Sequence, residues 1–161
     1  MVLIVKIKDY TFSVHEKDEG EYKYLEPPYI CITILNSRGE EEVYIDLTDE
    51  FTLSMGGAYH AHYDPDDESY QEMVSDLMDY LEGRICTAAL YLHAGEKNMQ
   101  WKSSTMIFAA NASEKMTKQN FQWQFKDKHF RCDLKRYGGE VHYNFFEPEK
   151  NITVMLEKVE N

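Results

Sequence analysis

The chain has 161 residues, of which 43% are hydrophobic and 14% aromatic, and its formal net charge at pH 7 is −12. That length is typical of one domain, so we expect residues 1–161 to form a single domain, and the apolar content excludes disorder by composition. No stretch approaches the roughly 20 apolar residues of a membrane-spanning helix, and the strong negative charge disfavours binding to nucleic acid or to an anionic membrane.

The first third of the chain predicts strands and one exposed loop. Residues 3–8 and 10–14 alternate between apolar and polar side chains, which predicts an N-terminal hairpin or one long bent strand. The charged stretch 16–27 ends in prolines and predicts an exposed loop. The segments 29–35 and 43–47 flank a turn-forming Asn-Ser-Arg-Gly sequence, which predicts a β-hairpin.

The next segments predict a strand and the one strong helix of the chain. Residues 51–55 alternate and lead into a Gly-Gly turn. Asp66 or Asp67 can cap the N-terminus of a helix that ends at Gly83. The apolar face of this helix comprises Tyr70, Met73, Val74, Leu77, Met78 and Leu81. Its opposite face is almost wholly acidic and comprises Glu72, Ser75, Asp76, Asp79 and Glu82.

The remainder of the chain predicts further strands. Residues 85–92 predict a central strand and residues 106–110 another, with polar loops around 95–104, whereas residues 111–120 show no clear pattern. Alternating segments predict a C-terminal meander at 121–125, 130–134, 141–145 and 152–156. We therefore expect an α+β fold, a mainly antiparallel β-sheet with one principal amphipathic helix.

Charge is divided unequally between the two halves of the sequence. Residues 1–83 contain 20 Asp/Glu and five Lys/Arg, a net charge of −15, whereas residues 84–161 contain nine and 12, a net charge of +3. An acidic field of this size accelerates the capture of a basic partner by long-range attraction. The alternative is that this acidity only keeps the protein soluble.

The cysteines and the N-terminus favour a cytoplasmic location. Cys31, Cys86 and Cys132 are odd in number and widely spaced, and each lies in an apolar segment typical of a strand. We therefore expect buried free thiols in a reducing compartment. No signal peptide is expected, because the apolar run Val2–Val5 is followed at once by Lys6.

One short segment offers a candidate metal site. In an extended chain His60, His62 and Asp64 point to one side, where they could hold a divalent metal in a small metal-dependent enzyme. Metallo-β-lactamase-type hydrolases have a similar His-x-His-x-Asp-His pattern, but Pro65 replaces its last His here. The alternative is that both histidines lie on a half-exposed strand end. No nucleophile or phosphate-binding motif occurs, so no enzyme and no cofactor are predicted otherwise.

The stretch 50–83, with its strand, its Tyr-His-Ala-His-Tyr-Asp segment and its acidic helix, resembles segments of small bacterial immunity proteins of polymorphic or contact-dependent toxin systems. The resemblance implies a cytosolic, acidic, non-enzymatic protein that binds one cognate toxin domain. We therefore predict a protein-binding module whose acidic surface covers a basic toxin domain, without nucleic acid or membrane as partner. The predicted contact residues are Glu41, Asp46, Tyr59, Tyr63, Tyr70, Glu72, Asp76 and Asp79. A structural or regulatory domain without a ligand is the further alternative.

Overall fold

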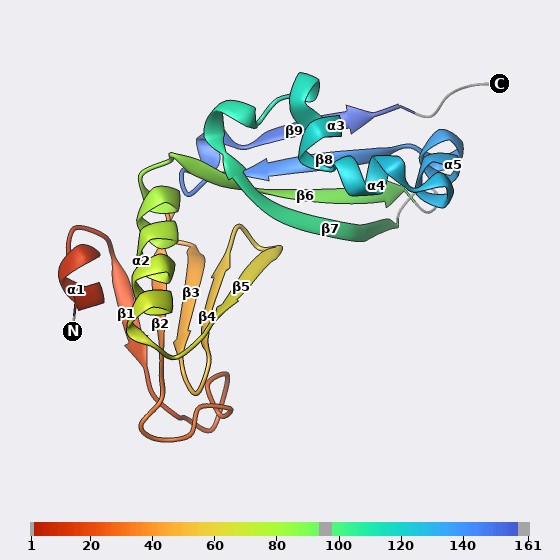
Figure 1. Ribbon diagram of the computed structural model, residues 1–161. Helices are drawn as coiled ribbons and strands as arrows, with labels where there is room; N and C mark the ends of the chain where they lie inside the picture. The colour runs from red at the N-terminus through yellow and green to blue at the C-terminus, as the bar shows by residue number, and fades with distance from the viewer. Residues whose placement is uncertain (1, 94–97, 158–161) are drawn as a thin grey trace.

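The protein has an α+β fold built from two antiparallel sheets (Figure 1). The computed structural model describes residues 2–93 and 98–157. The first sheet has the strand order β1-β2-β3-β4-β5, with β1 Phe12–His15, β2 Ile30–Leu35, β3 Glu41–Leu47, β4 Phe51–Met55 and β5 Tyr59–Tyr63. The second has the order β7-β6-β8-β9, with β6 Ile85–His93, β7 Met99–Phe108, β8 Gly139–Asn144 and β9 Ile152–Leu156. The helices are α1 Val2–Lys6, α2 Asp67–Leu81, α3 Thr117–Asn120, α4 Gln122–Lys126 and α5 Lys128–Tyr137.

The principal helix α2 packs its apolar face against the first sheet, as predicted (Figure 1). Its N-cap is Asp66, whose carboxylate accepts a hydrogen bond from the Ser69 amide at 2.8 Å. Met73 and Leu77 are fully buried against Ile45 and Leu53 of the sheet's inner face. With 15 residues, α2 is the longest helix of the described chain. None of the described helices is both long and apolar enough to cross a bilayer.

The N-terminal prediction of a strand over residues 3–8 is wrong, because Val2–Lys6 forms helix α1. Leu3 and Ile7 lie four residues apart, hence on one face of a helical turn, and both are fully buried in the first core. The Leu3 amide donates a hydrogen bond to the Tyr70 hydroxyl of α2 at 3.1 Å. A short apolar run fits a strand and a helix equally well, so packing against α2 decides the outcome.

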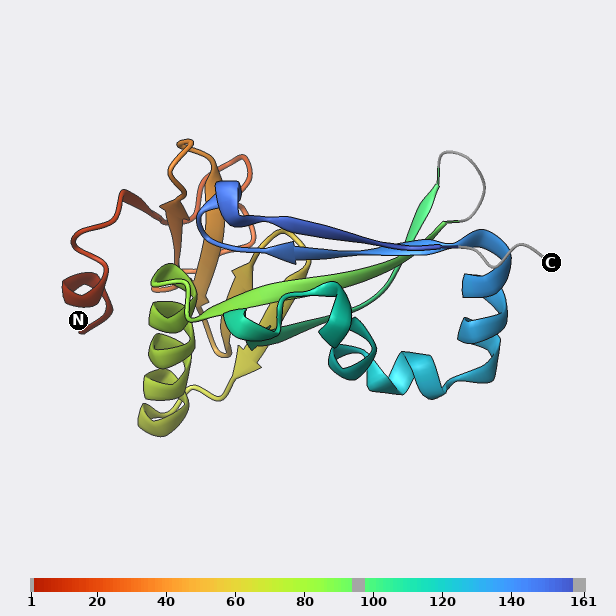
Figure 2. The ribbon, with the colours of Figure 1, turned by 90° about the horizontal axis from the view of Figure 1, so that it is seen from above.

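The second sheet buries one face beneath α3, α4 and α5 (Figures 1 and 2). Its core combines Leu90 and Val141 of the strands with Phe121 and Phe130 of the helical layer. The second cluster belongs to the second sheet, the first lies on the first sheet but also includes Ile85 of β6, and a smaller third cluster lies under the loop before β2.

The predicted strands at 121–125 and 130–134 are helices α4 and α5 instead. Asp127 caps α5 by accepting a hydrogen bond from the Phe130 amide at 2.9 Å. Phe130 and Leu134 then face the second core at helical spacing. Cys132 consequently lies exposed on α5, whereas Cys31 and Cys86 are buried as expected.

Strand β7 begins earlier than predicted. Met99–Phe108 pairs with β6 along its length, so residues 99–104 belong to the sheet and not to a loop. Residues 95–97 of the predicted loop lie outside the described residues. The predicted strands at β2, β3, β4, β6, β8 and β9 are confirmed.

The two sheets meet where the β4–β5 turn reaches the second sheet. The Asn144 side-chain amide donates a hydrogen bond to the Gly56 carbonyl at 3.1 Å. Gly56 has φ +59° and lies so close to β6 that a Cβ there would stand 2.1 Å from Thr87 Oγ1. Figure 2 shows the second sheet extending away from this junction toward α5. The junction therefore depends on a residue without a side chain.

Candidate binding site

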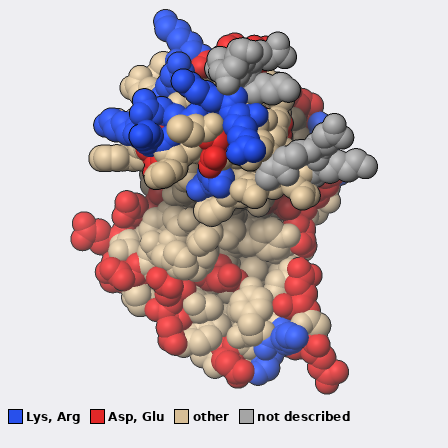
Figure 3. Space-filling view, turned by 90° about the vertical axis from the view of Figure 1, so that its right-hand side faces the viewer, with Lys and Arg blue, Asp and Glu red and all other residues tan. Residues whose placement is uncertain are grey.

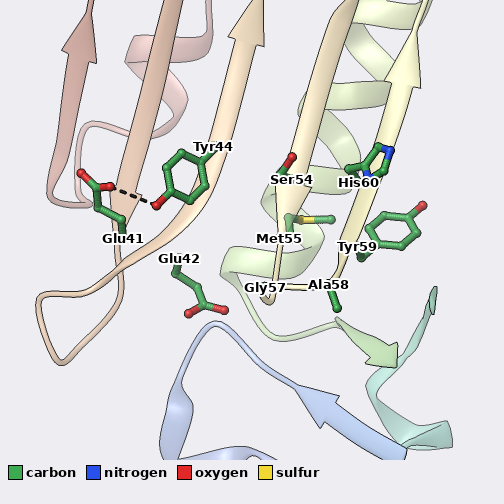
Figure 4. Close-up of a pocket in the computed structure, with 9 residues that line it drawn as sticks. All are labelled: Glu41, Glu42, Tyr44, Ser54, Met55, Gly57, Ala58, Tyr59 and His60. Atoms are coloured by element: carbon green, nitrogen blue, oxygen red, sulfur yellow. Dashed lines mark hydrogen bonds between the residues drawn. The ribbon is translucent and has the colours of Figure 1, made fainter. Parts of the chain in front are cut away.

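A pocket of about 430 Å³ opens at the end of the first sheet that faces this junction (Figure 4). Three neighbouring strands supply its walls, because Tyr44 pairs with Ser54 and Ser54 with His60 across β3, β4 and β5. The lining residues are Glu41, Glu42, Tyr44, Ser54, Met55, Gly57, Ala58, Tyr59 and His60. The pocket thus combines two carboxyl groups with hydroxyl and imidazole groups.

Glu42 is the most enclosed acid of this pocket. Its carboxylate accepts hydrogen bonds from the Tyr80 hydroxyl at 2.9 Å and from the Asn36 amide at 3.3 Å. Burial raises the pKa of the Glu42 carboxyl, and these two hydrogen bonds offset only part of that effect. A cation brought into the pocket would favour the ionised form of this carboxyl.

Glu41 and Tyr44 form the more open wall of the pocket. The Tyr44 hydroxyl donates a hydrogen bond to Glu41 Oε2 at 3.0 Å, as Figure 4 shows. Burial, together with this hydrogen bond and the charge of Glu41, raises the pKa of Tyr44 to about 12. The phenol therefore stays a neutral donor at physiological pH, and Glu41 keeps acceptor capacity toward solvent.

The candidate metal trio is not assembled in the described part of the chain, where no group of three or more His, Cys, Asp or Glu side chains could hold a metal ion. His60 and His62 do share the outer face of β5, with ring centroids 5.1 Å apart. His62 Nδ1, however, lies 2.9 Å from Glu50 Oε2, and Asp64 follows the end of the strand. His60 therefore lines the pocket, and His62 pairs with Glu50 at the surface.

The predicted acidic surface is divided between two faces of the first sheet. Glu41 and Asp46 lie on β3, where Asp46 accepts a hydrogen bond from the Tyr24 hydroxyl at 2.7 Å. The exposed Glu72 lies on α2, which covers the opposite face. Two further acids of α2 have partners, since Asp76 accepts a hydrogen bond from Tyr63 and Asp79 forms a salt bridge with Arg84. The predicted residues therefore do not form one continuous patch.

Of the three predicted aromatic contacts, only Tyr59 lines the pocket. Tyr63 is 8% exposed and donates a hydrogen bond to Asp76 Oδ2 at 2.8 Å, so it offers little surface to a partner. Tyr70 packs against the first core, where its ring meets Phe51 edge to face. Tyr63 and Tyr70 thus hold α2 to the sheet.

The loop before β2 is exposed over most of its length, as predicted, but two of its side chains are buried. Tyr22 and Leu25 are buried against Cys31, so this charged segment is anchored on the outer face of the first sheet. It covers β2 and the adjoining part of β3, where Tyr44 packs against it. The uncovered remainder of that face lies nearer β4 and β5.

Charge is segregated in space as well as in sequence. In Figure 3 acidic side chains surround the lower part of the molecule, which contains the first sheet, and cationic side chains gather on the upper part. The candidate pocket belongs to the acidic part. A positively charged partner would therefore be drawn toward it.

A second cluster of ionisable groups, on the second sheet, was not predicted. Glu140 lies between two histidines, with Oε2 3.1 Å from His93 Nε2 and Oε1 2.5 Å from His142 Nε2. The Tyr91 ring packs beside that of His142. Burial raises the pKa of the Glu140 carboxyl, but the hydrogen bonds and charges of the two histidines outweigh it, and the pKa lies below its usual value.

This depressed pKa predicts a loss of stability in acid. Glu140 contributes stability above the pKa of an unfolded glutamate, roughly 4.3, and loses it as the pH falls through the lower folded value. Glu140→Gln should lower the free energy of unfolding at pH 7 by about 1–2 kcal/mol and by less at pH 3. Urea denaturation across this range measures the difference. The exposed Glu72→Gln is the control, and an equal pH dependence in both variants would contradict the assignment.

Comparison with protein family models, with curated proteins and with solved structures finds no match to this chain. The candidate site is therefore defined by its own geometry and charge.

Proposed function

We propose that this protein is a protein-binding module that docks a basic partner, and most concretely a cytoplasmic immunity protein that neutralises a toxin domain. The observation that carries the proposal is the pocket in which Glu41 and Glu42 lie beside Tyr44 in the acidic part of the molecule. The resemblance of residues 50–83 to immunity proteins gives the proposal its specific form.

The pocket suits a lysine or arginine side chain of the partner. Its volume of about 430 Å³ admits one long side chain, and carboxylates at two positions offer several acceptors for a guanidinium or ammonium group. The rings of Tyr44 and Tyr59 can pack against the methylene stem of that side chain. Such a desolvated charged anchor would slow dissociation, while the surrounding acids would speed association.

Charge reversal separates these two contributions. Glu41→Lys and Glu72→Lys change the net charge equally, but only Glu41 lines the pocket, whereas Glu72 lies on α2 across the sheet. Both should slow association to a similar extent at low salt. Only Glu41→Lys should also raise the dissociation rate, by about tenfold or more.

The immunity function predicts that a toxin domain is encoded beside this protein's gene, and that domain is the partner for this measurement. Co-expression should protect cells from that domain, and surface plasmon resonance gives both rate constants. Failure of the protein to protect or to bind would refute the immunity function. Equal dissociation rates for the two variants would instead place the contact outside the pocket. If the protein is instead a structural or regulatory domain without a ligand, neither variant should bind the toxin domain.

A further inference from the structure

A second groove, opposite in charge to the pocket, lies on the helical side of the second sheet. Its volume is about 890 Å³, and its walls come from α3, α5 and the end of β9. Phe125, Leu134 and Leu156 give it an apolar floor that is continuous with the second core. Its cationic side chains are Lys115, Lys118, Arg131 and Lys135.

The helical layer around this groove carries an excess of positive charge. Residues 114–137 contain seven Lys/Arg and three Asp/Glu. Within the described residues none of these seven cations forms a salt bridge. Figure 3 shows the cations gathered on this part of the molecule, well separated from the acidic sheet. The groove therefore favours an anionic ligand.

The groove also borders a sheet edge. Among the described residues, strand β9 is the last strand of the second sheet and pairs with β8 alone. Ile152 and Met155 on it are 38% and 56% exposed. An edge strand offers backbone N–H and C=O groups to an additional strand, and five residues of β9 span roughly 17 Å.

We propose that the groove binds an extended acidic segment of a protein, which pairs with β9. Its carboxylates would contact Lys118, Arg131 and Lys135, and an apolar side chain between them would cover the floor. A long polyanion such as nucleic acid fits less well, because Glu114 and Glu157 also line the groove and the first sheet is strongly acidic. This site is independent of the acidic pocket, since it lies on the other sheet and selects the opposite charge.

The test uses a fluorescent peptide of about nine residues, Glu-Thr-Leu-Thr-Glu-Thr-Leu-Thr-Glu, whose charged and apolar side chains share one face when extended. Fluorescence anisotropy should show binding to the full chain. Arg131→Glu combined with Lys135→Glu should weaken it by about tenfold or more. The matched control is Lys126→Glu with Lys128→Glu, which makes the same charge change on the same layer outside the groove and should weaken binding no more than about threefold.

Backbone pairing is tested separately with two peptides of the same sequence, one N-methylated at the odd positions and one at the even positions. Alternate amides of an extended strand point to opposite edges, so one of the two peptides carries its methyl groups on the edge that faces β9. That peptide should lose binding although its charge is unchanged, whereas the other should keep it. Equal binding of both methylated peptides, equal effects of the two double variants, or tighter binding of oligodeoxythymidylate would overturn the proposal. Sedimentation that shows a dimer disrupted by the Arg131/Lys135 reversal would assign the groove to a second copy instead. Circular dichroism verifies that each variant is folded.

Discussion

Leu77→Asp is expected to unfold the first sheet and α2, or to lower the free energy of unfolding by at least ~3 kcal/mol. Leu77 is fully buried between α2 and the strands of the first sheet. The substitution removes apolar contacts and places a carboxylate in a core whose neighbouring side chains are Ile45, Leu53 and Met73. Urea denaturation followed by circular dichroism measures the loss.

Ser75→Asp is the control for this substitution. It introduces the same side chain into the same helix at an exposed position, so it should change stability by less than about 0.5 kcal/mol. Both tryptophans, Trp101 and Trp123, belong to the second sheet and its helical layer, so any change in their fluorescence on unfolding comes from that half. Coincident fluorescence and dichroism transitions would show that both halves unfold together. An unchanged melting temperature for Leu77→Asp would contradict the assigned core face.

The elements predicted correctly are those in which local signals agree with one another. Helix α2 has an Asp cap, an apolar stripe of more than three turns and a terminal glycine, so no strand arrangement could bury the same residues. The hairpin of β2 and β3 has β-branched strands on both sides of a turn sequence. In α2 and in the β2–β3 hairpin, tertiary packing favours the same secondary structure as the local sequence signals.

The elements predicted wrongly are short and have patterns that fit two periods. In α5 the residues Phe130 and Leu134 are two alternations apart in a strand and also one turn apart in a helix. The Asp127 cap distinguishes the two, but Asp-Lys is also a plausible turn sequence. The same ambiguity affects α1, where contacts with a helix more than 60 residues away in sequence select the helical form.

The candidate site was only partly predictable for a related reason. Counting charges identified Glu41 as part of an acidic region, and alternation alone places Tyr44 on the face opposite Ile45. The pocket exists because pairing across three strands brings Tyr44, Ser54 and His60 into one row. Sequence patterns do not determine which residues of β3, β4 and β5 pair with one another. They also do not determine the position of the second sheet, which leaves the pocket beside this row open.

Gly56→Ala is expected to have the second largest effect, because Gly56 lies at the contact between the two sheets. Its φ of +59° is unfavourable for a residue with a side chain, and an added Cβ would lie 2.1 Å from Thr87 Oγ1 and 3.2 Å from Asn144 Cβ. Backbone strain and overpacking together should cost about 2–4 kcal/mol. Neighbouring Gly57 provides the control, since its φ is +70° but no atom of the described residues lies within 4 Å of an added Cβ. Gly57→Ala should therefore show the backbone cost alone, about 1 kcal/mol.

Thr87→Ala tests whether the extra cost of Gly56→Ala arises at this contact. The Thr87 hydroxyl is buried and has no hydrogen-bond partner among the described residues, so Thr87→Ala should cost the parent protein only the roughly 1 kcal/mol of the buried methyl group that is lost with it. In the Gly56→Ala background the same change removes the atom nearest the new methyl group and should restore about 1–2 kcal/mol. A double-mutant cycle measured by urea denaturation gives this coupling. Additive effects would show that the two sheets do not meet at Gly56 and Thr87.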